Sequence, residues 1–280
     1  MGVLVLGATG TVGPHVVTAL LGRGAGPRVL TRNAARARTI LPAGTELVEG
    51  DPGDDSTVAA AAEGADAVFL LSEHDHDMSD LQLRIIRALR RTGARIVKLS
   101  GTSSAINPDG PYTCRQHWEI EHVLAASGQP WSVIRPNAFM QTLIGTIMLP
   151  AVRETGKIPN AIGGAGISFV DARDIGEVCA EVLLNDVWAG ETLVLTGSRA
   201  VTFAEIADQL GAATIDITPA DVRENLLGRG MALWEAEHFQ EMYQLFRDGE
   251  SEFVTADVER VLGRAPRTVE DYLHETMEPA

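Results

Sequence analysis

The sequence predicts an α/β fold built on a doubly wound parallel sheet, with a smaller lobe formed by the C-terminal part of the chain. Short apolar runs alternate with segments of helical spacing over the first 150 residues. The joints between them are short, which favours parallel strands linked by right-handed crossovers. A glycine-rich turn joins the first apolar run to the first helical segment. At 280 residues and 45% hydrophobic composition, the chain can bury a full α/β core.

Apolar runs in this first part predict the strands of the sheet. In chain order the predicted strands cover residues 3–6, 28–31, 46–49, 67–71, 95–99 and 131–135. Helical spacing of apolar residues predicts a helix after each of the first five, at about residues 12–21, 34–38, 56–63, 81–89 and 113–126. Asp54 or Asp55 is placed to cap the third of these helices.

Residues 7–13, Gly-Ala-Thr-Gly-Thr-Val-Gly, form the turn between the first strand and the first helix. In this context one glycine allows a tight turn, one lets the backbone approach a pyrophosphate, and one lets the helix pack closely on the sheet. The helix N-terminus favours an anion, and Pro14 has no N–H to lose there. The turn therefore predicts a dinucleotide-binding site of the Rossmann type.

Arg32, which directly follows the second strand, predicts which dinucleotide is bound. A carboxylate there would bind the ribose 2′-hydroxyl of NAD, whereas a guanidinium offers donors suited to a 2′-phosphate. Residues 1–40 contain five arginines and no acidic residue, in a chain of net charge −15. A solvated helix face is the alternative explanation, and it fits Arg23 and Arg38. For Arg32 we predict a contact with the 2′-phosphate, and hence NADP(H) as the cofactor.

The acidic composition argues against nucleic acid and anionic membrane surfaces as partners. Cys114 and Cys179 are too few for a disulfide framework and lack the spacing of metal ligands. The polar run 73–77 contains two histidines but is expected to be a solvated loop, so we predict no metal site. The chain enters a strand directly and has no uninterrupted apolar stretch of about 18 residues. We therefore expect a cytoplasmic protein that does not enter a membrane.

Beyond residue 150 the alternation becomes looser. Residues 156–166 form a glycine-rich loop in this interpretation, residues 169–175 a short strand that leads into a helix, and residues 192–196 a further strand. Thr202 is expected to cap a helix, with Glu205 at the reciprocal position of a capping box.

A long helical stretch over residues 231–246 carries a stripe of large side chains that is most simply core, although part of it could line a pocket. We predict an NAD(P)-binding core of residues 1–150, to which residues 167–197 return. A smaller substrate-binding lobe would comprise residues 151–166 and 198–280.

Several short motifs occur in the order typical of one family. They are the turn 7–13, Leu-Thr-Arg-Asn at 30–33, Glu-Gly-Asp at 49–51, Ile-Arg-Pro-Asn-Ala-Phe-Met at 134–140, Phe-Val-Asp-Ala-Arg-Asp at 169–174, Leu-Thr-Gly at 195–197, and the segment 254–268. Over nearly its whole length the chain resembles the NmrA-like branch of the atypical short-chain dehydrogenases. That branch includes NADPH-dependent reductases of quinones, azo dyes and triphenylmethane dyes, isoflavone-type reductases, and non-catalytic redox sensors.

The resemblance implies roles for residues near the ends of the predicted strands. It places Gly7, Thr9, Gly10, Thr11, Val12 and Gly13 at the pyrophosphate, Arg32 at the 2′-phosphate, Asp51 at the adenine region, and Ser72, Ser100 and Pro136 with Asn137 on the nicotinamide side. Because ligands of such sheets bind beyond the carboxyl ends of the strands, we expect these residues to surround one crevice.

The catalytic pair of the standard short-chain dehydrogenases, a Tyr followed four residues later by a Lys, is absent. The residues at that spacing after the three tyrosines are Gln116, Arg247 and Thr276. A proton would then come from another group or from water. His117, on the helix after the serine-rich segment 100–104, is the first candidate because a histidine suits general acid catalysis near neutral pH. A surface or packing histidine is an equally good interpretation, and Tyr112 is the second candidate.

We therefore expect an NADPH-dependent reductase of a small apolar carbonyl, enone, quinone or imine compound. The substrate would occupy a pocket between the sheet and residues 139–166 and 225–246. Two alternatives stay open at this point: a non-catalytic NADP(H)-sensing regulatory protein, which the missing Tyr–Lys pair favours, and a cyclase or isomerase without net redox chemistry. The fold alone does not separate them. A homodimer is also left open.

Overall fold

The computed structural model describes residues 1–277, which divide into two compact units. The first unit comprises three segments: Met1–Gly101, Gln116–Arg135 and Ala172–Leu193. The second comprises Thr102–Arg115, Pro136–Asp171 and the chain from Val194 onward. Each unit is therefore assembled from segments that are distant in sequence. The predicted division into a cofactor core and a substrate-binding lobe concerns function and stays a prediction.

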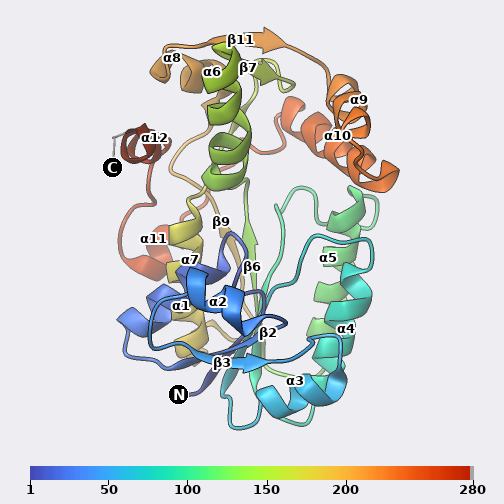
Figure 1. Cartoon of the computed structure of the whole chain (residues 1–280), viewed down its shortest axis with the longest axis vertical. Helices are drawn as coiled ribbons and strands as arrows, with labels where there is room; N and C mark the ends of the chain where they lie inside the picture. Colours follow the sequence, from blue (N-terminus) through green and yellow to red (C-terminus); the bar gives the residue numbers. More distant parts are fainter. Residues whose placement is uncertain (278–280) are drawn as a thin grey trace. The chain divides into compact units, whose positions relative to one another are not determined.

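A seven-stranded sheet organises the first unit (Figure 1), with the strand order β3-β2-β1-β4-β5-β6-β9. The pairs from β3 through to β6 are all parallel. The strands are β1 (Val3–Val5), β2 (Pro27–Thr31), β3 (Glu46–Glu49), β4 (Ala67–Leu70), β5 (Arg95–Leu99), β6 (Trp131–Pro136) and β9 (Thr192–Leu195). The order reverses between β1 and β4, as in doubly wound dinucleotide-binding sheets, so the predicted fold class is confirmed.

Helices cover both faces of this sheet (Figure 1). On one face, α3 (Asp55–Ala61), α4 (Met78–Leu89) and α5 (Tyr112–Ala125) bury apolar side chains in one core with those of β1, β4 and β5. On the other face lie α1 (Gly13–Gly22), α2 (Ala34–Ile40) and α7 (Ala172–Leu184). Asp54 accepts a hydrogen bond from the backbone N–H of Ser56 and caps α3, as predicted.

Helices α1 and α7 lie unusually close to each other, because α7 carries a glycine at the contact. A Cβ atom on Gly176 would lie 2.5 Å from the Cβ of His15 and 3.0 Å from the backbone nitrogen of Val16. The backbone of α7 therefore touches the helix that follows the glycine turn, and α7 holds that helix against the sheet.

The second unit contains two small sheets. Strand β7 (Lys157–Asn160) pairs in parallel with β11 (Ala213–Asp216), and β8 (Gly166–Ile167) pairs antiparallel with β10 (Val201–Thr202). The prediction of a loop over residues 156–166 was therefore wrong in part. These strands are short and their partners lie far along the chain, so local patterning does not indicate them.

The other elements of the second unit are helical. They are the π-helix η1 (Met140–Met148), α6 (Leu149–Thr155), α8 (Phe203–Gln209), α9 (Pro219–Gly228), α10 (Leu233–Arg247), α11 (Asp257–Leu262) and α12 (Val269–Met277). Thr202 and Glu205 form the predicted capping box at the start of α8. Phe246 of α10 is buried in the core of this unit and Met242 packs against it, which confirms the core interpretation for that part of the stripe.

Residues 169–171 do not form the predicted strand. Val170 makes only an isolated parallel bridge with Phe139, and α7 then begins at Ala172. The segment is buried, so its apolar residues serve packing rather than a sheet.

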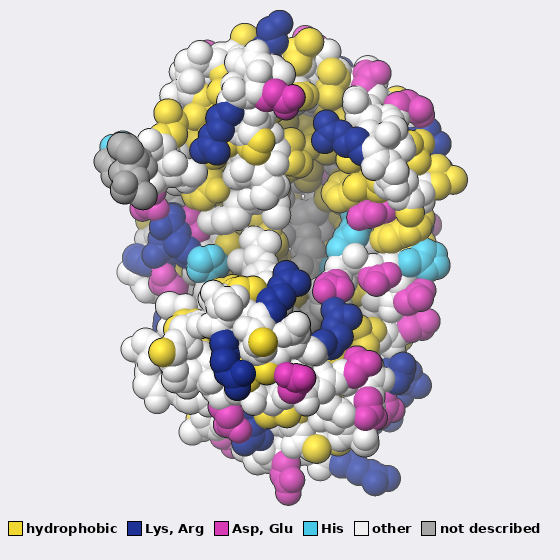
Figure 2. Space-filling view, viewed as in Figure 1, with side chains coloured by type: hydrophobic (Ala, Val, Ile, Leu, Met, Phe, Trp, Pro, Cys, Tyr) yellow, Lys and Arg dark blue, Asp and Glu magenta, His cyan; other side chains and the backbone are white. Residues whose placement is uncertain are grey.

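Within residues 1–277, no helix is both long and apolar enough to cross a membrane. On the face drawn in Figure 2, acidic and basic side chains are interspersed rather than separated into regions of one sign.

Substitution of Gly176 by Ala tests the close contact between α1 and α7. The added methyl group would overlap with backbone atoms of α1, and such overpacking costs about 1–3 kcal/mol. We expect a lower free energy of unfolding, measured by denaturant titration. Gly22→Ala is the matched control, because it is also helical and its Cβ would meet no atom within 4 Å. Equal stabilities of the two variants would contradict the contact.

Candidate functional site

At two positions of the turn 7–13, neighbouring protein atoms leave no room for any residue larger than glycine. Gly7 has a φ of 72°, and a Cβ atom there would lie 2.6 Å from the carbonyl oxygen of Leu71. A Cβ atom on Gly13 would lie 2.4 Å from the carbonyl oxygen of Gly7 and 2.5 Å from Ala8. The turn therefore passes close to the end of β4, and α1 begins close to the turn.

Gly10 differs from these two glycines because its surroundings are open. A Cβ atom there would meet only the carbonyl oxygen of Gly7, at 3.7 Å, and the residue is exposed. Helix α1 starts beside Gly10. Its N-cap residue, Val12, makes no side-chain hydrogen bond to the helix, and its first turn has no acidic residue. An uncapped helix start beside an open glycine fits a pyrophosphate group, which accepts hydrogen bonds from backbone N–H groups.

Arg32 lies directly after β2, and its Nη2 donates a hydrogen bond of 2.8 Å to Oε1 of Glu73. Glu73 follows β4, so both residues lie at the carboxyl edge of the sheet. The pair is solvent-exposed, with 62% of the Arg32 side chain and 74% of the Glu73 side chain accessible. An exposed ion pair contributes little free energy, so a phosphate group is able to replace Glu73.

Asp51 and Ser72 also lie just beyond strand ends, and both side chains have partners in the first unit. Asp51 Oδ1 accepts a hydrogen bond of 2.8 Å from the N–H of Gly53, which fixes the turn before α3. The hydroxyl of Ser72 accepts a hydrogen bond of 2.9 Å from the amide of Gln82. Their contacts with the adenine and nicotinamide regions stay predictions.

Ser100 follows β5, and its hydroxyl group donates a hydrogen bond to another side chain of the first unit. The hydroxyl donates a hydrogen bond of 2.5 Å to Glu121 on α5, and Arg135 of β6 forms an ion pair of 2.5 Å with the same carboxylate. A contact of Ser100 with the nicotinamide side, which also stays a prediction, would therefore use its oxygen as an acceptor.

His117 lies in the second turn of α5 and is half-buried. Its Nδ1 is 2.9 Å from the Nζ of Lys98, a residue of β5 with no exposed surface. The same Nζ donates a hydrogen bond of 3.1 Å to the carbonyl of Leu99. Burial lowers the pKa of Lys98 to about 7, while the charge of Glu121 raises it and that of Arg135 lowers it further.

Lys98 was not among the predicted site residues, because in the sequence it is only one residue of a predicted strand. A signal was nevertheless available, since a lysine next to the apolar residues of a buried strand needs a partner for its amine. The partner is the histidine chosen as the first proton-donor candidate.

Tyr112 and Pro136 belong to the second unit, whereas the residues described above belong to the first. Tyr112 begins α5, and its ring lies 5.1 Å from that of Trp234 in α10, measured between centroids. The guanidinium of Arg115 lies 5.5 Å from the centroid of the tyrosine ring. Pro136 ends β6 and is buried. The catalytic role of Tyr112 and the cofactor contact of Pro136 stay predictions.

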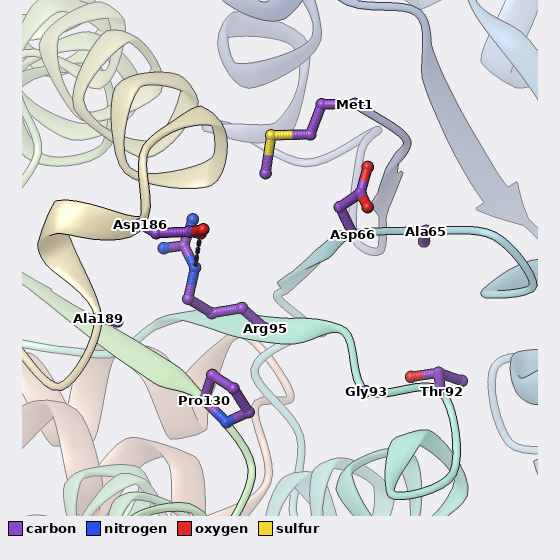
Figure 3. Close-up of a pocket in the computed structure, with 9 residues that line it drawn as sticks. All are labelled: Met1, Ala65, Asp66, Thr92, Gly93, Arg95, Pro130, Asp186 and Ala189. Carbon is purple, nitrogen blue, oxygen red and sulfur yellow. Dashed lines mark ion pairs between the residues drawn. The ribbon is translucent and has the colours of Figure 1, made fainter.

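A hollow in the first unit lies at the opposite edge of the sheet (Figure 3), where the strands begin. Arg95, the first residue of β5, lines it and pairs with Asp186, with 3.4 Å between Nε and Oδ1. Its Nη2 also donates to the carbonyl of Leu183, so the side chain fastens the end of α7 to the sheet. Because ligands of doubly wound sheets bind at the carboxyl ends of the strands, we assign this hollow a structural role.

Cys114 and Cys179 are free and buried, and burial raises the pKa of the Cys114 thiol to about 12. In the part of the chain that the structure describes, no group of three or more His, Cys, Asp or Glu side chains is arranged to hold a metal ion.

Comparison with known proteins identifies the family. The model of the NmrA-like family matches residues 2–273. The NAD(P)H azoreductase of Xenophilus azovorans is 30% identical over 96% of both chains. The (4-alkanoyl-5-oxo-2,5-dihydrofuran-3-yl)methyl phosphate reductase of Streptomyces griseus is 30% identical over 99% of this chain and 98% of its own.

Among solved structures, the NADPH-dependent quinone oxidoreductase of Escherichia coli in complex with NADPH has the same fold. It superposes with a TM-score of 0.88 at 21% sequence identity, covering 99% of this chain and 100% of its own. The predicted cofactor, NADP(H), and the predicted enzyme class, an oxidoreductase, agree with the names of these proteins. Together the family model and the two relatives show that the chain belongs to the NmrA-like family.

Proposed function

We propose that the protein is an NADPH-dependent reductase of a small apolar carbonyl, enone, quinone or imine compound. The azoreductase and the dihydrofuran-type reductase support a reducible double bond as the acceptor group, since each is named for a compound that contains one; the compound named for the second also carries a phosphate.

The cofactor would be held by the carboxyl edge of the first unit. The open backbone at Gly10 and the uncapped start of α1 would bind the pyrophosphate, and Arg32 would exchange Glu73 for the 2′-phosphate. Thr9, Thr11 and Val12 of the same turn would contribute backbone contacts. When bound, NADPH supplies a hydride to the acceptor.

The single observation that favours a reductase over a sensor is the pair formed by Lys98 and His117. Reduction of a carbonyl or an enone needs a proton as well as a hydride, and a general acid must carry an exchangeable proton near neutral pH. The amine of Lys98 and the imidazole of His117, 2.9 Å apart, would supply such a proton. A protein that only senses the cofactor has no need to bury an amine beside an imidazole.

NADPH oxidation measured against quinones, enones, ketones, imines and azo compounds tests the proposal. Turnover of any of them supports a reductase. If none is reduced while NADPH still raises the melting temperature, the sensor is favoured. Conversion of an acceptor without net loss of NADPH would favour the cyclase or isomerase.

Replacement of Gly10 by Val tests the pyrophosphate site. A side chain there would fill space that the protein leaves open, so we expect the Kd for NADPH to rise by at least ~10-fold, or about 1.4 kcal/mol. The variant should fold, because the position is open and does not have a positive φ. Calorimetry measures binding, with Gly22→Val as the control. Unchanged affinity in a folded Gly10→Val protein would place the pyrophosphate elsewhere.

Replacement of Arg32 by Asp tests the cofactor preference. Hydrogen bonds between charged groups contribute about 1.5–3 kcal/mol, so the wild type should bind NADPH about 10- to 100-fold more tightly than NADH. Arg32→Asp should reverse this order, because a carboxylate repels the 2′-phosphate and accepts from the 2′-hydroxyl. Equal affinities of the wild type for both cofactors, measured by calorimetry, would rule the assignment out.

Glu73→Gln is the matched variant for this test. It removes the carboxylate that competes with the phosphate for Arg32. We expect the affinity for NADPH to rise about 2- to 5-fold, given that exposed pairs contribute about 0–1 kcal/mol, and the affinity for NADH to stay the same. A parallel change for both cofactors would mean that Glu73 acts on something other than the 2′-phosphate site.

Replacement of His117 by Ala tests the proton donor. Loss of a positioned general acid lowers kcat by ~10²-fold or more. The Kd for NADPH should change little, because the proposed pyrophosphate and phosphate contacts are made by other residues. Steady-state kinetics with the best acceptor give kcat, and calorimetry gives the Kd.

His122→Ala is the control on the same helix, since His122 is exposed and its Nδ1 bonds to the carbonyl of Trp118 in its own helix. Near-normal turnover of the His117→Ala protein would show that His117 is structural, and the donor would then be Tyr112, another side chain or solvent.

A further inference from the structure

Lys98 is a fully buried basic residue inside the central sheet. Transfer of an ammonium group out of water is costly unless hydrogen bonds and an opposite charge compensate for it. The Nζ atom contacts two groups within the described chain, the carbonyl of Leu99 and Nδ1 of His117. Neither of them is an anion.

Glu121, the carboxylate whose charge raises the pKa of Lys98, is already engaged by other groups. Glu121 on α5 accepts hydrogen bonds from Nε of Arg135, at 3.1 and 3.2 Å, and from the hydroxyl of Ser100. Glu121 and Arg135 therefore neutralise each other, and their opposing effects on the pKa of Lys98 follow from their charges. Burial then decides the balance and lowers that pKa to about 7.

Lys98 and His117 form a coupled pair of bases. Two positive charges 2.9 Å apart in a medium of low polarity repel strongly, so the pair holds one extra proton near neutral pH rather than two. When that proton is on Lys98, the amine donates to Nδ1, and the imidazole must carry its own hydrogen on Nε2.

We propose that Lys98 is the positioning residue for His117: its amine fixes the imidazole tautomer that carries hydrogen on Nε2 and replaces the proton that His117 gives to the substrate. This inference rests on the proposed function for its chemical step. The pairing itself is a property of the protein without substrate or cofactor, and can be measured there.

The acceptor gains a hydride from NADPH, which leaves NADP⁺, and gains a proton from Nε2 of His117. The bond from Nζ of Lys98 to its proton breaks, and Nδ1 of His117 takes that proton. The products are a neutral amine and a neutral imidazole with hydrogen on Nδ1, and solvent restores the proton afterwards.

The state of the pair can be observed by NMR without any turnover. We expect the Nδ1 of His117 to give the nitrogen shift of an acceptor and Nε2 that of a protonated nitrogen. The chain has only two lysines, Lys98 and Lys157, so lysine labelled with ¹³C at Cε gives two signals. The signal of Lys98 should titrate near pH 7, with that of the exposed Lys157 as the internal reference. An Nδ1–H tautomer, or a Lys98 that titrates with Lys157, would overturn the inference.

Kinetics of Lys98→Met test the step, with Lys157→Met as the control. Methionine keeps the apolar stem but supplies no proton, so we expect kcat at pH 7, where the wild-type pair still carries its extra proton, to fall by ~10²-fold with little change in KM or in the Kd for NADPH. In the variant His117 must first be protonated from solvent. The deficit should therefore shrink as the pH is lowered toward 5.5, where a histidine becomes charged.

A deficit of the same size at every pH would mean that Lys98 is merely structural and would overturn the inference. A wild-type protein that shows the paired state by NMR but reduces no acceptor would support the pairing and overturn the reductase. These two failures are therefore distinguishable.

Discussion

The close approach of the glycine turn to the end of β4 is the constraint on which the first unit depends. Gly7 and Gly13 have backbone or carbonyl atoms where any other residue would place its Cβ, so the start of α1 has little freedom to move. Helix α7 then packs on α1 through Gly176, again without room for a side chain. Gly10, between these two glycines, has open surroundings.

A second constraint is the burial of charge at β5. Lys98 has no exposed surface, and the fold provides its amine with an imidazole rather than a carboxylate as a partner. A carboxylate partner would hold the proton on Lys98 at all physiological pH values, because an opposite charge favours the charged form. An imidazole leaves the proton exchangeable, and the ion pair of Glu121 with Arg135 keeps the remaining charge balanced.

The sequence predicted most of the first unit because its signals are local. The apolar runs, the glycine turn and Arg32 at the end of β2 each depend on residues that are close along the chain. The contact between Lys98 and His117 joins a strand to a helix 19 residues later and depends on how α5 lies over the sheet. Glu73 as a partner of Arg32, like the pairing of β7 with β11, follows from chain segments that meet only in the folded protein. Residue patterns carry no information on such distances.

The three segments of the first unit have a consequence for how the protein is made. Helix α7 reaches the unit only after the chain has passed through residues 136–171 of the second. During synthesis the face of α1 that packs on α7 stays uncovered until about residue 184 has left the ribosome. The sheet itself is complete only after β9 (Thr192–Leu195) has followed. A fragment that ends after β6 would therefore expose apolar surface and would aggregate rather than act as an independent domain.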